Sequence, residues 1–321
     1  MSLLPRFLYP GPLYLLAATG LAFALDALYP YHSGPMLTVH PVHTSFVLAT
    51  KLYRPRGSRA RGLAIWLSVL MVHAAAYGAL LYLAWLAGPP VWVVVAGYVI
   101  KTSISLRLLI DTVDGVGGAL RAQRLDEARS LAQGLVRRDL SREDPGHVAS
   151  AAVESLAESL VDGLASPLLW LSILGPLGAL SQRVVNTLDG ALGFKDPDHV
   201  DIGFVSAWAD TIMNYVPARL TALIIALASP AGGGSVRNAL SSWLTCAGLT
   251  ESRNAGHPMS AMSGAVEVAL EKRGSYTLCA HYGRLPNGDD VNSAIRVSIA
   301  SAVALAALTS ALTTAFWLLI Q

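Results

Sequence analysis

The sequence predicts an all-α, polytopic membrane protein, and three observations lead to this fold class. Of its 321 residues, 53% are hydrophobic and only 14% are charged, whereas soluble domains carry about 25% charged residues. The mean hydropathy is +0.49. No Asp, Glu, Lys or Arg lies between Arg61 and Lys101, and none follows Arg296. Because a membrane helix needs only ~20 apolar residues, these runs argue against an ordinary soluble enzyme.

Four apolar stretches are expected to cross the membrane as helices. They are residues 6–26, the two halves of 62–100 on either side of the 87–90 turn, and 296–321. Two more stretches, 163–182 and 220–235, have a suitable length but contain prolines, so spans, re-entrant segments and buried core remain open for them. Residues 36–50 are too short and too rich in His to assign. The sequence therefore predicts four firm helices and up to six or seven.

The charge distribution predicts one integral-membrane domain, 1–321, with a polar middle. It comprises an N-terminal transmembrane part over 1–113, a polar helical part over 114–295 and a C-terminal transmembrane helix over 296–321. The loop 51–61 holds basic residues and no acidic one, which predicts that it faces the cytoplasm. The polar part would then lie on the cytoplasmic side, and we expect a multi-pass protein of the cell membrane.

Several functional classes are excluded by composition and motif. A formal net charge of +2 is too small to indicate a nucleic-acid partner. The segment 101–103 lacks the glycine that a P-loop places before its lysine, and no Gly-x-Ser-x-Gly elbow occurs. Cys246 and Cys279 are far apart and form no Cys-x-x-Cys, so we expect neither a disulfide framework nor a thiolate zinc site.

Two helices are predicted in the polar part. Residues 119–137 have the spacing of an amphipathic helix, which the segment 141–146 ends. In the second helix, 149–164, three acidic residues recur every four positions and therefore share one face. They are Glu154, Glu158 and Asp162.

Like charges at this spacing repel each other, so something cationic is expected beside them. A divalent metal, an amine or an arginine would serve. A solvated face, or pairing of the acids with Arg183 or Arg219, is an equally weighted alternative.

Polar side chains recur downstream of the acidic helix. Asn186 and Asp189 follow an apolar run, and Asp210 and Asn214 are one helical turn apart, shortly before Arg219. Such oxygen ligands suit Mg²⁺, and the guanidinium would bind a phosphate or carboxylate through two hydrogen bonds. The alternatives are a turn or cap role for Asp189 and an interfacial anchor for Arg219.

Six separated blocks carry a resemblance to a known family. They are Asp26 with 40–42, 136–139, 151–163 with 166–168, 185–189 with Gly193, 210–221, and 254–258. On these blocks the chain resembles the adenosylcobinamide-phosphate synthase family, the CobD/CbiB membrane proteins of cobalamin biosynthesis. It departs from the family pattern at Ser159, Ala209 and Arg253, and over residues 276–292.

The resemblance implies an ATP-dependent and Mg²⁺-dependent ligase. Its reaction would join the amine of aminopropanol phosphate to the carboxylate of the corrinoid adenosylcobyric acid. The lipid bilayer and other enzymes of the pathway would be partners, and nucleic acid would not. Arg138 and Arg219 are then candidates for the phosphate clamp, and Glu154 or Glu158 for the proton acceptor.

The expected site residues fall into three groups. The catalytic candidates are Glu154, Glu158 and Asp162. The substrate-binding candidates are Arg138, Asp139, Asn186, Asp189, Asn214, Arg219, Asn254 and His40. The metal-ligand candidates are Glu158, Asp162, Asp189 and Asp210.

Two other functions remain as alternatives. One is a Mg²⁺-dependent membrane phosphotransferase that uses the same carboxylates. The other is a corrinoid-binding or transport protein without chemistry, for which ionisable residues are expected inside the spans. Because the acids lie outside the four firm spans, the sequence favours an enzyme.

Overall fold

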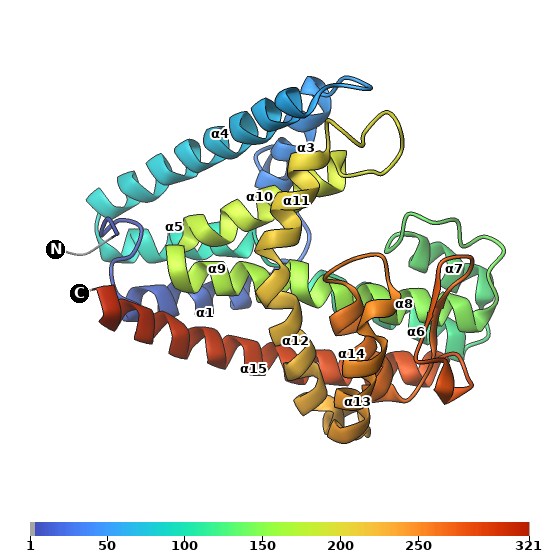
Figure 1. The fold of residues 1–321 in the computed structure, drawn as a ribbon. Coiled ribbons are helices and arrows are strands. Elements are labelled where there is room, and N and C mark those ends of the chain that lie inside the picture. Colours follow the sequence, from blue (N-terminus) through green and yellow to red (C-terminus); the bar gives the residue numbers. More distant parts are fainter. Residues whose placement is uncertain (1–3, 321) are drawn as a thin grey trace. The chain divides into compact units, whose positions relative to one another are not determined.

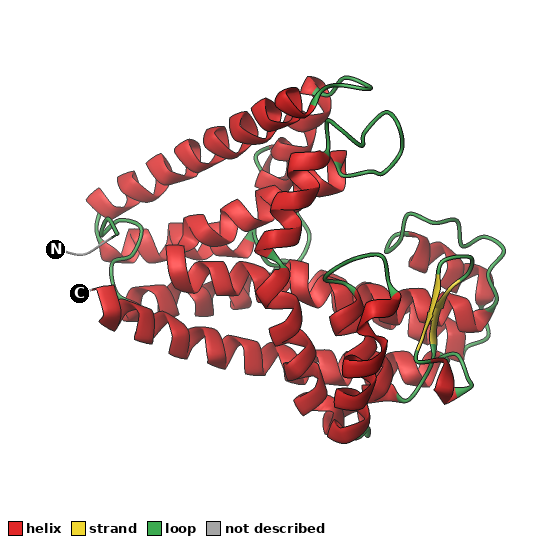
Figure 2. Ribbon diagram, viewed as in Figure 1, coloured by secondary structure: helices red, strands yellow, loops and turns green. Residues whose placement is uncertain are grey.

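The computed structural model describes residues 4–320, and these are almost entirely helical (Figures 1 and 2). Among them the only strands are β1 (Leu270–Lys272) and β2 (Tyr276–Leu278), which pair antiparallel with Leu270 opposite Leu278. Between the strands Gly274 adopts a φ of 71°, which glycine tolerates without steric cost. The all-α fold class is confirmed.

The chain forms two compact units, each built from segments that are separate in the sequence. The first contains Met1–Ser105, Asp162–Asn214 and Ala307–Gln321, and the second contains Leu106–Val161 and Tyr215–Ala306. Helix α15 (Gly288–Ile320) contributes residues to both.

The first unit is organised around helix α10. Its elements are α1 (Pro12–Leu28), α2 (Gly34–Thr38), α3 (Pro41–Leu52), α4 (Arg59–Leu86), α5 (Pro89–Lys101), the π-helical turn η1 (Val161–Ala165, from Asp162 on), α9 (Ser166–Leu174), α10 (Pro176–Leu192) and α11 (Phe204–Met213). Helix α10 packs against α3, α4, α5, α9 and α11 (Figure 1). Leu180 and Leu188 of this helix are almost completely buried, so it forms the apolar centre of the unit.

A glycine separates α9 from α10. Gly175 has a φ of 69°, and a Cβ at this position would collide with the backbone carbonyl of Leu8. Only glycine fits both constraints, and Pro176 then starts α10 at a position where its missing N–H is not needed. The apolar stretch expected over 163–182 is therefore divided between two helices.

The second unit is organised around α8 and α14. Its elements are α6 (Leu106–Arg121), α7 (Leu125–Gln133), α8 (Pro145–Leu160), α12 (Tyr215–Ala228), η2 (Ser229–Gly232), α13 (Val236–Cys246), η3 (Ala247–Leu249), α14 (Gly256–Val266), the two strands and η4 (Ala280–Tyr282). Helix α14 packs against α8, α12 and α13, and α8 also contacts β1. Asp144 caps α8, since its Oδ1 accepts a hydrogen bond from the His147 amide at 3.0 Å.

The helix expected over 119–137 is interrupted in the structure. Helix α6 ends at Arg121 and α7 begins at Leu125. Gln123 lies between them with a φ of 58°, a left-handed conformation that stops a right-handed helix. The helical periodicity on both sides was read correctly, but it did not reveal the break.

Five helical segments are long and apolar enough to cross a membrane. They are Arg59–Leu86, Pro89–Arg121, Pro145–Leu174, Tyr215–Gly232 and Gly288–Leu319. By length and composition the chain is therefore a multi-pass membrane protein. The stretch 6–26, expected as a firm span, forms the shorter helix Pro12–Leu28.

Three acidic residues lie in a spanning-length segment that was not among the four firm spans. Pro145–Leu174 contains Glu154, Glu158 and Asp162. The segment has this length because α8 continues through a π-helical turn, Val161–Ala165, directly into α9. A π-helical turn within a helix is common at functional sites.

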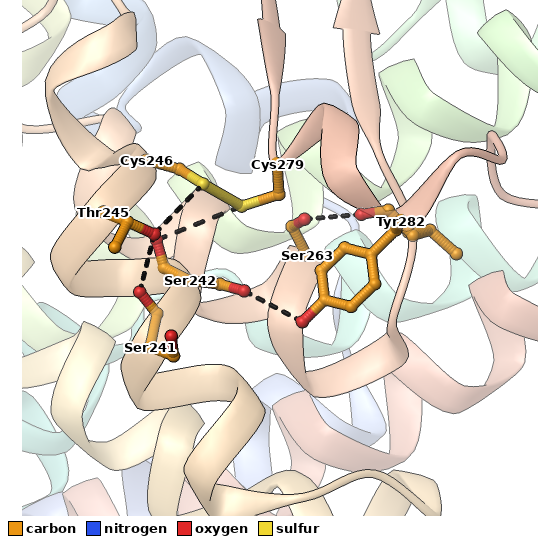
Figure 3. The surroundings of a disulfide bond; sticks show 8 residues. Ser241, Ser242, Thr245, Cys246, Ser263, Cys279 and Tyr282 are labelled. Carbon is orange, nitrogen blue, oxygen red and sulfur yellow. Dashed lines mark hydrogen bonds between the residues drawn. A yellow bond between two sulfur atoms is a disulfide. The ribbon is translucent and has the colours of Figure 1, made fainter.

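A disulfide joins Cys246 to Cys279, contrary to the expectation from the sequence (Figure 3). Cys246 ends α13 and Cys279 follows β2, and their Cα atoms are 5.7 Å apart. In the same region the hydroxyls of Ser242 and Tyr282 are 2.9 Å apart. The spacing of 33 residues gave no sign of this pairing, because packing of the segment after the hairpin on α13 brings the two thiols together.

Candidate functional site

Four of the expected site residues meet in the first unit. The Nδ2 of Asn214 donates to Asp162 Oδ1 at 3.1 Å and to Asp210 Oδ1 at 3.0 Å. The Nδ2 of Asn186 donates to the same Asp210 oxygen at 3.2 Å. These side chains come from η1, α10 and α11 and from the residue that ends α11. The structure thus groups two carboxylates and two amides that are far apart in the sequence.

The neighbouring residues Gln182 and Arg183 complete this cluster, which we call the amide–carboxylate cluster. Gln182 is fully buried and donates to Asn214 Oδ1 at 3.2 Å, which orients that amide toward both carboxylates. Arg183 lies one turn before Asn186 on α10, and its Nη1 donates to the Asn186 Oδ1 at 3.5 Å.

Burial controls the ionisation of the cluster. It raises the pKa of Asp210, while the hydrogen bonds from Asn186 and Asn214 and the charge of Arg183 oppose the rise. Burial likewise lowers the pKa of Arg183, against the attraction of Asp162 and Asp210. A guanidinium remains protonated in proteins nevertheless. The cluster therefore holds a half-buried positive charge beside carboxylates.

The donor atoms of the cluster fit Mg²⁺. Mg²⁺ is bound by oxygen ligands and commonly takes one or two carboxylates, with waters and substrate phosphates in the other positions. Asp162 and Asp210 supply two carboxylates, whereas the amide oxygens of Asn186 and Asn214 accept hydrogen bonds from Arg183 and Gln182. No three His, Cys, Asp or Glu side chains of residues 4–320 are grouped in a way that could hold a metal. A divalent ion here would thus take its remaining ligands from substrate and water.

Asp189 lies further along α10, near its C-terminal end. A Cβ added at Gly193 would collide with the Asp189 carboxylate, and the Gly193 amide donates to the Asp189 carbonyl at 2.7 Å. The Asp189 side chain thus lies against the backbone at the C-terminal end of α10.

His40 lies at the start of α3 and caps it. Its Nδ1 accepts a hydrogen bond from the Val42 amide at 3.3 Å. Burial, together with nearby positive groups that include Lys101 and Arg183, lowers the pKa of His40 to about 3, so the ring is neutral. The ring of His32 is 4.4 Å away, and Lys101 Nζ is 3.4 Å from the Nδ1 of His32.

Glu154 is the centre of a second group, located in the second unit, which we call the Glu154 network. Its Oε1 accepts from Ser150 Oγ at 2.7 Å and from Arg138 Nη2 at 3.5 Å. Its Oε2 accepts from the hydroxyl of Tyr276 at 2.7 Å. Glu154 pairs with Arg138, and not with Arg183 or Arg219, which the sequence suggested as partners for the acids. Ser150 also accepts the Glu271 amide at 2.7 Å, so the network ties α8 to the β-hairpin.

Glu158 and Asp139 differ from Glu154 in their surroundings. Glu158 is exposed on α8. The charge of Glu158 acts on Tyr276 of the Glu154 network. Burial first, and the charges of Glu154 and Glu158 in addition, raise the pKa of the Tyr276 hydroxyl. Asp139 accepts hydrogen bonds from the amide and hydroxyl of Ser141 at 2.8 and 3.0 Å, which lower its pKa. Asp139 thereby stabilises its own loop.

Arg219 and Asn254 contact each other in the second unit. Arg219 Nη1 donates to the Tyr215 carbonyl at 2.7 Å and to Asn254 Oδ1 at 3.3 Å. Its Nη2 donates to the Arg253 carbonyl at 3.3 Å, and the guanidinium carbon is 3.4 Å from the centre of the Tyr215 ring. Protein groups therefore engage this arginine on its face and its edge.

Sequence reasoning missed several residues of both groups. Gln182 was not considered, although a buried amide inside an apolar run is a usable signal. Arg183 was considered only as a partner for acids. Ser150 and Tyr276 are ordinary residues in sequence, and Tyr276 begins the segment that departs from the family pattern, so no signal pointed to them.

Comparisons with known proteins agree on one family. The sequence model of the CobD/CbiB protein family matches residues 19–306. The "Probable cobalamin biosynthesis protein CobD" of Aeropyrum pernix is 49% identical over 273 residues, 85% of each chain. The protein of the same name from Thermoplasma acidophilum is 31% identical over 280 residues, 86% of this chain and 90% of that one. No solved structure matches.

Proposed function

The chain belongs to the CobD/CbiB family, and from this premise we propose that it acts in cobalamin biosynthesis as the adenosylcobinamide-phosphate synthase. It would form an amide bond between the amine of aminopropanol phosphate and the corrinoid carboxylate of adenosylcobyric acid. The observation that carries the proposal is the amide–carboxylate cluster with Arg183 beside it, because this reaction must handle phosphate groups and Mg²⁺.

The chemistry requires activation of the corrinoid carboxylate. An amine displaces hydroxide from a carboxylate poorly, so an oxygen must first be phosphorylated or adenylated, and ATP is the reagent that the family resemblance implies. Mg²⁺, when bound, would neutralise phosphate charge. Asp162 and Asp210 are its proposed protein ligands, and Asn186 and Asn214 keep these carboxylates in place through the hydrogen bonds described above.

The attacking amine must also lose a proton. Both oxygens of Glu154 accept hydrogen bonds in the Glu154 network, so this residue is better suited to positioning its neighbours. Glu158 is exposed one turn later on α8. Because an exposed carboxylate can meet an incoming amine, we propose Glu158 as the proton acceptor.

The decisive experiment is a synthesis assay with the purified chain in detergent. The mixture contains adenosylcobyric acid, aminopropanol phosphate, ATP and Mg²⁺, and mass spectrometry detects the product. Product that requires all four components supports the synthase. Phosphoryl transfer to a lipid alcohol would instead indicate the phosphotransferase alternative.

One observation favours a second candidate function, that of a corrinoid-binding or transport protein. Glu154, Glu158 and Asp162 lie in a segment of spanning length, as expected for a corrinoid-binding or transport protein. Binding of the corrinoid without product in the complete mixture would favour that function.

The role of Glu158 can be tested in the same assay. Glu158→Gln should lower turnover by roughly 100-fold or more, since a general base contributes at least that much. Glu127→Gln is the matched control, because Glu127 is an exposed acid of α7 in the same unit. Equal turnover of the Glu158→Gln variant and the wild type would remove Glu158 from the mechanism.

A further inference from the structure

Arg183 is a half-buried arginine whose hydrogen bonds are all long. Its Nη1 donates to the Asp162 carbonyl at 3.4 Å and to Asn186 Oδ1 at 3.5 Å, and its Nη2 donates to Ser105 Oγ at 3.4 Å. Typical N–H···O bonds measure about 2.7–3.2 Å. Its Nε is buried and has no hydrogen-bond partner within residues 4–320. The guanidinium fork is therefore available to a better acceptor.

Other arginines of the chain form shorter hydrogen bonds and ion pairs than Arg183 does. Arg284 binds both oxygens of Asp290 at 2.6 and 2.9 Å, and Arg107 is 2.7 Å from Asp111. In these two pairs the residues are four and six positions apart in the sequence and partly exposed, where an ion pair contributes little. Arg183 is the opposite case, because its side chain is half-buried, its Nε is buried without a partner within residues 4–320, and its hydrogen bonds measure 3.4–3.5 Å. A buried donor without an acceptor is costly.

We propose that Arg183 binds the phosphate group of a substrate in the first unit, next to Asp162 and Asp210. The ligand class is a phosphate monoester or the phosphate chain of a nucleotide. This inference rests on the proposed function and deepens it, because it names the side chain that takes the phosphate.

The two arginines expected to form the phosphate clamp lie in the second unit. Arg219 is held by Tyr215, Arg253 and Asn254, and its donors would have to give up these partners before they bound a ligand. Arg138 has Glu154 as its partner at 3.5 Å, and neither arginine is next to Asp162 and Asp210 as Arg183 is.

The two carboxylates beside Arg183 make binding dependent on a divalent cation. A phosphate dianion next to Asp162 and Asp210 would be repelled, and Mg²⁺ between them would remove the repulsion. Mg²⁺ should therefore strengthen phosphate binding in the wild type, and this linkage can be measured without turnover.

The test is equilibrium binding to the full chain in detergent, by calorimetry. The probes are aminopropanol phosphate, inorganic phosphate and a non-hydrolysable ATP analogue, each with and without Mg²⁺. Arg183→Lys keeps the charge but loses the fork, and Arg183→Gln loses both. We expect roughly 10-fold weaker binding for the lysine variant and roughly 100-fold for the glutamine variant, as for lost charge-assisted hydrogen bonds.

Two controls make the result interpretable. Arg56→Lys changes an arginine of the same unit whose side chain is 80% exposed, and it should bind like the wild type. Melting temperature and size-exclusion profile show that each variant is folded, and the lysine variant serves where the glutamine variant does not fold.

The pattern across probes identifies the source of the phosphate. Weakened binding of aminopropanol phosphate alone assigns Arg183 to the amino alcohol, and weakened binding of the ATP analogue alone assigns it to the nucleotide. Wild-type affinity of folded Arg183 variants for all three probes overturns the inference.

Failure of the inference is distinguishable from failure of the proposed function. If the complete mixture yields amide while Arg183 variants bind phosphate normally, the inference is wrong and the synthase stands. If phosphate binding depends on Arg183 but no amide forms, the inference stands and the synthase is wrong.

Discussion

At the scale of single residues, Glu154 and Arg183 show that the partners of a charged side chain indicate its role. Glu154 is 6% exposed and has donors at 2.7 Å on both oxygens. Arg183 has only long contacts and an unpartnered buried Nε. Glu154 has hydrogen-bond donors on both of its oxygens and holds its neighbours in place, whereas the Nε of Arg183 is an unused donor.

The Glu154 network should contribute to stability through its bond to Tyr276. Tyr276→Phe should lower the free energy of unfolding by about 1.5–3 kcal/mol, because a hydrogen bond to a charged group is lost. Its effect should not simply add to that of Glu154→Gln, since the glutamine removes the charge from the same hydrogen bond. Denaturant unfolding in detergent measures both, with the exposed Tyr31→Phe as control. Additive effects would contradict the assignment.

Asp144 should make the second unit sensitive to acid. Burial would raise its pKa, but His147 and Arg273 outweigh burial and hold the pKa below the ordinary value of 3.8. The folded pKa is thus below the unfolded one, so this stabilisation is present above about pH 4 and is lost as the pH falls through the folded value. The melting temperature of the wild type should decline over that range more than that of Asp144→Asn. Parallel declines would show that Asp144 is not responsible.

At the scale of elements, local signals set several boundaries. The Asp144–Pro145 pair starts α8, Gly175–Pro176 separates α9 from α10, and the left-handed Gln123 divides α6 from α7. The first two are readable in the sequence as a cap and a breaker. Gln123 is not, because glutamine has no preference for a left-handed conformation.

The disulfide should stabilise the second unit. It closes a loop with a sequence separation of 33 residues, for which chain entropy predicts a contribution of about 3–4 kcal/mol. Cys246→Ser should therefore lower the melting temperature, and reductant should lower that of the wild type but not of the variant. Mass analysis under non-reducing conditions checks the bond itself. Two free thiols in the purified protein would contradict it.

At the scale of the whole molecule, membrane insertion is the dominant constraint. Five segments have the length and composition of spans. In the first unit the basic loop is held by an acidic one, because Arg56 and Arg59 pair with Asp198 and Asp201 at 3.0 and 2.9 Å. Both loops must therefore lie on the same side of the membrane.

Labelling of introduced cysteines tests this topology. Arg54→Cys and Lys195→Cys lie in the two paired loops, and both should react with an impermeant reagent from the cytoplasmic side. Ala87→Cys, at the other end of the span Arg59–Leu86, should react only from the opposite side. Labelling of positions 54 and 195 from different sides would contradict the paired loops.

Part of the site followed from the sequence. Asp162, Asn186, Asp210 and Asn214 were expected and lie together, since their spacing placed polar groups on otherwise apolar helices. The proposed role of Arg183 did not follow, because the sequence could not show that its Nε is buried without a partner or that it lies beside Asp162 and Asp210.

The sequence by itself determined the fold class and most of the spans, because charge-free runs and helical spacing are properties of one segment at a time. Only the tertiary structure decided which distant residues meet: Cys246 with Cys279, Glu154 with Tyr276, and Asn214 with Asp162. The physical reason is that periodicity fixes the face of a helix on which a side chain lies, whereas its partner depends on how that helix packs against others.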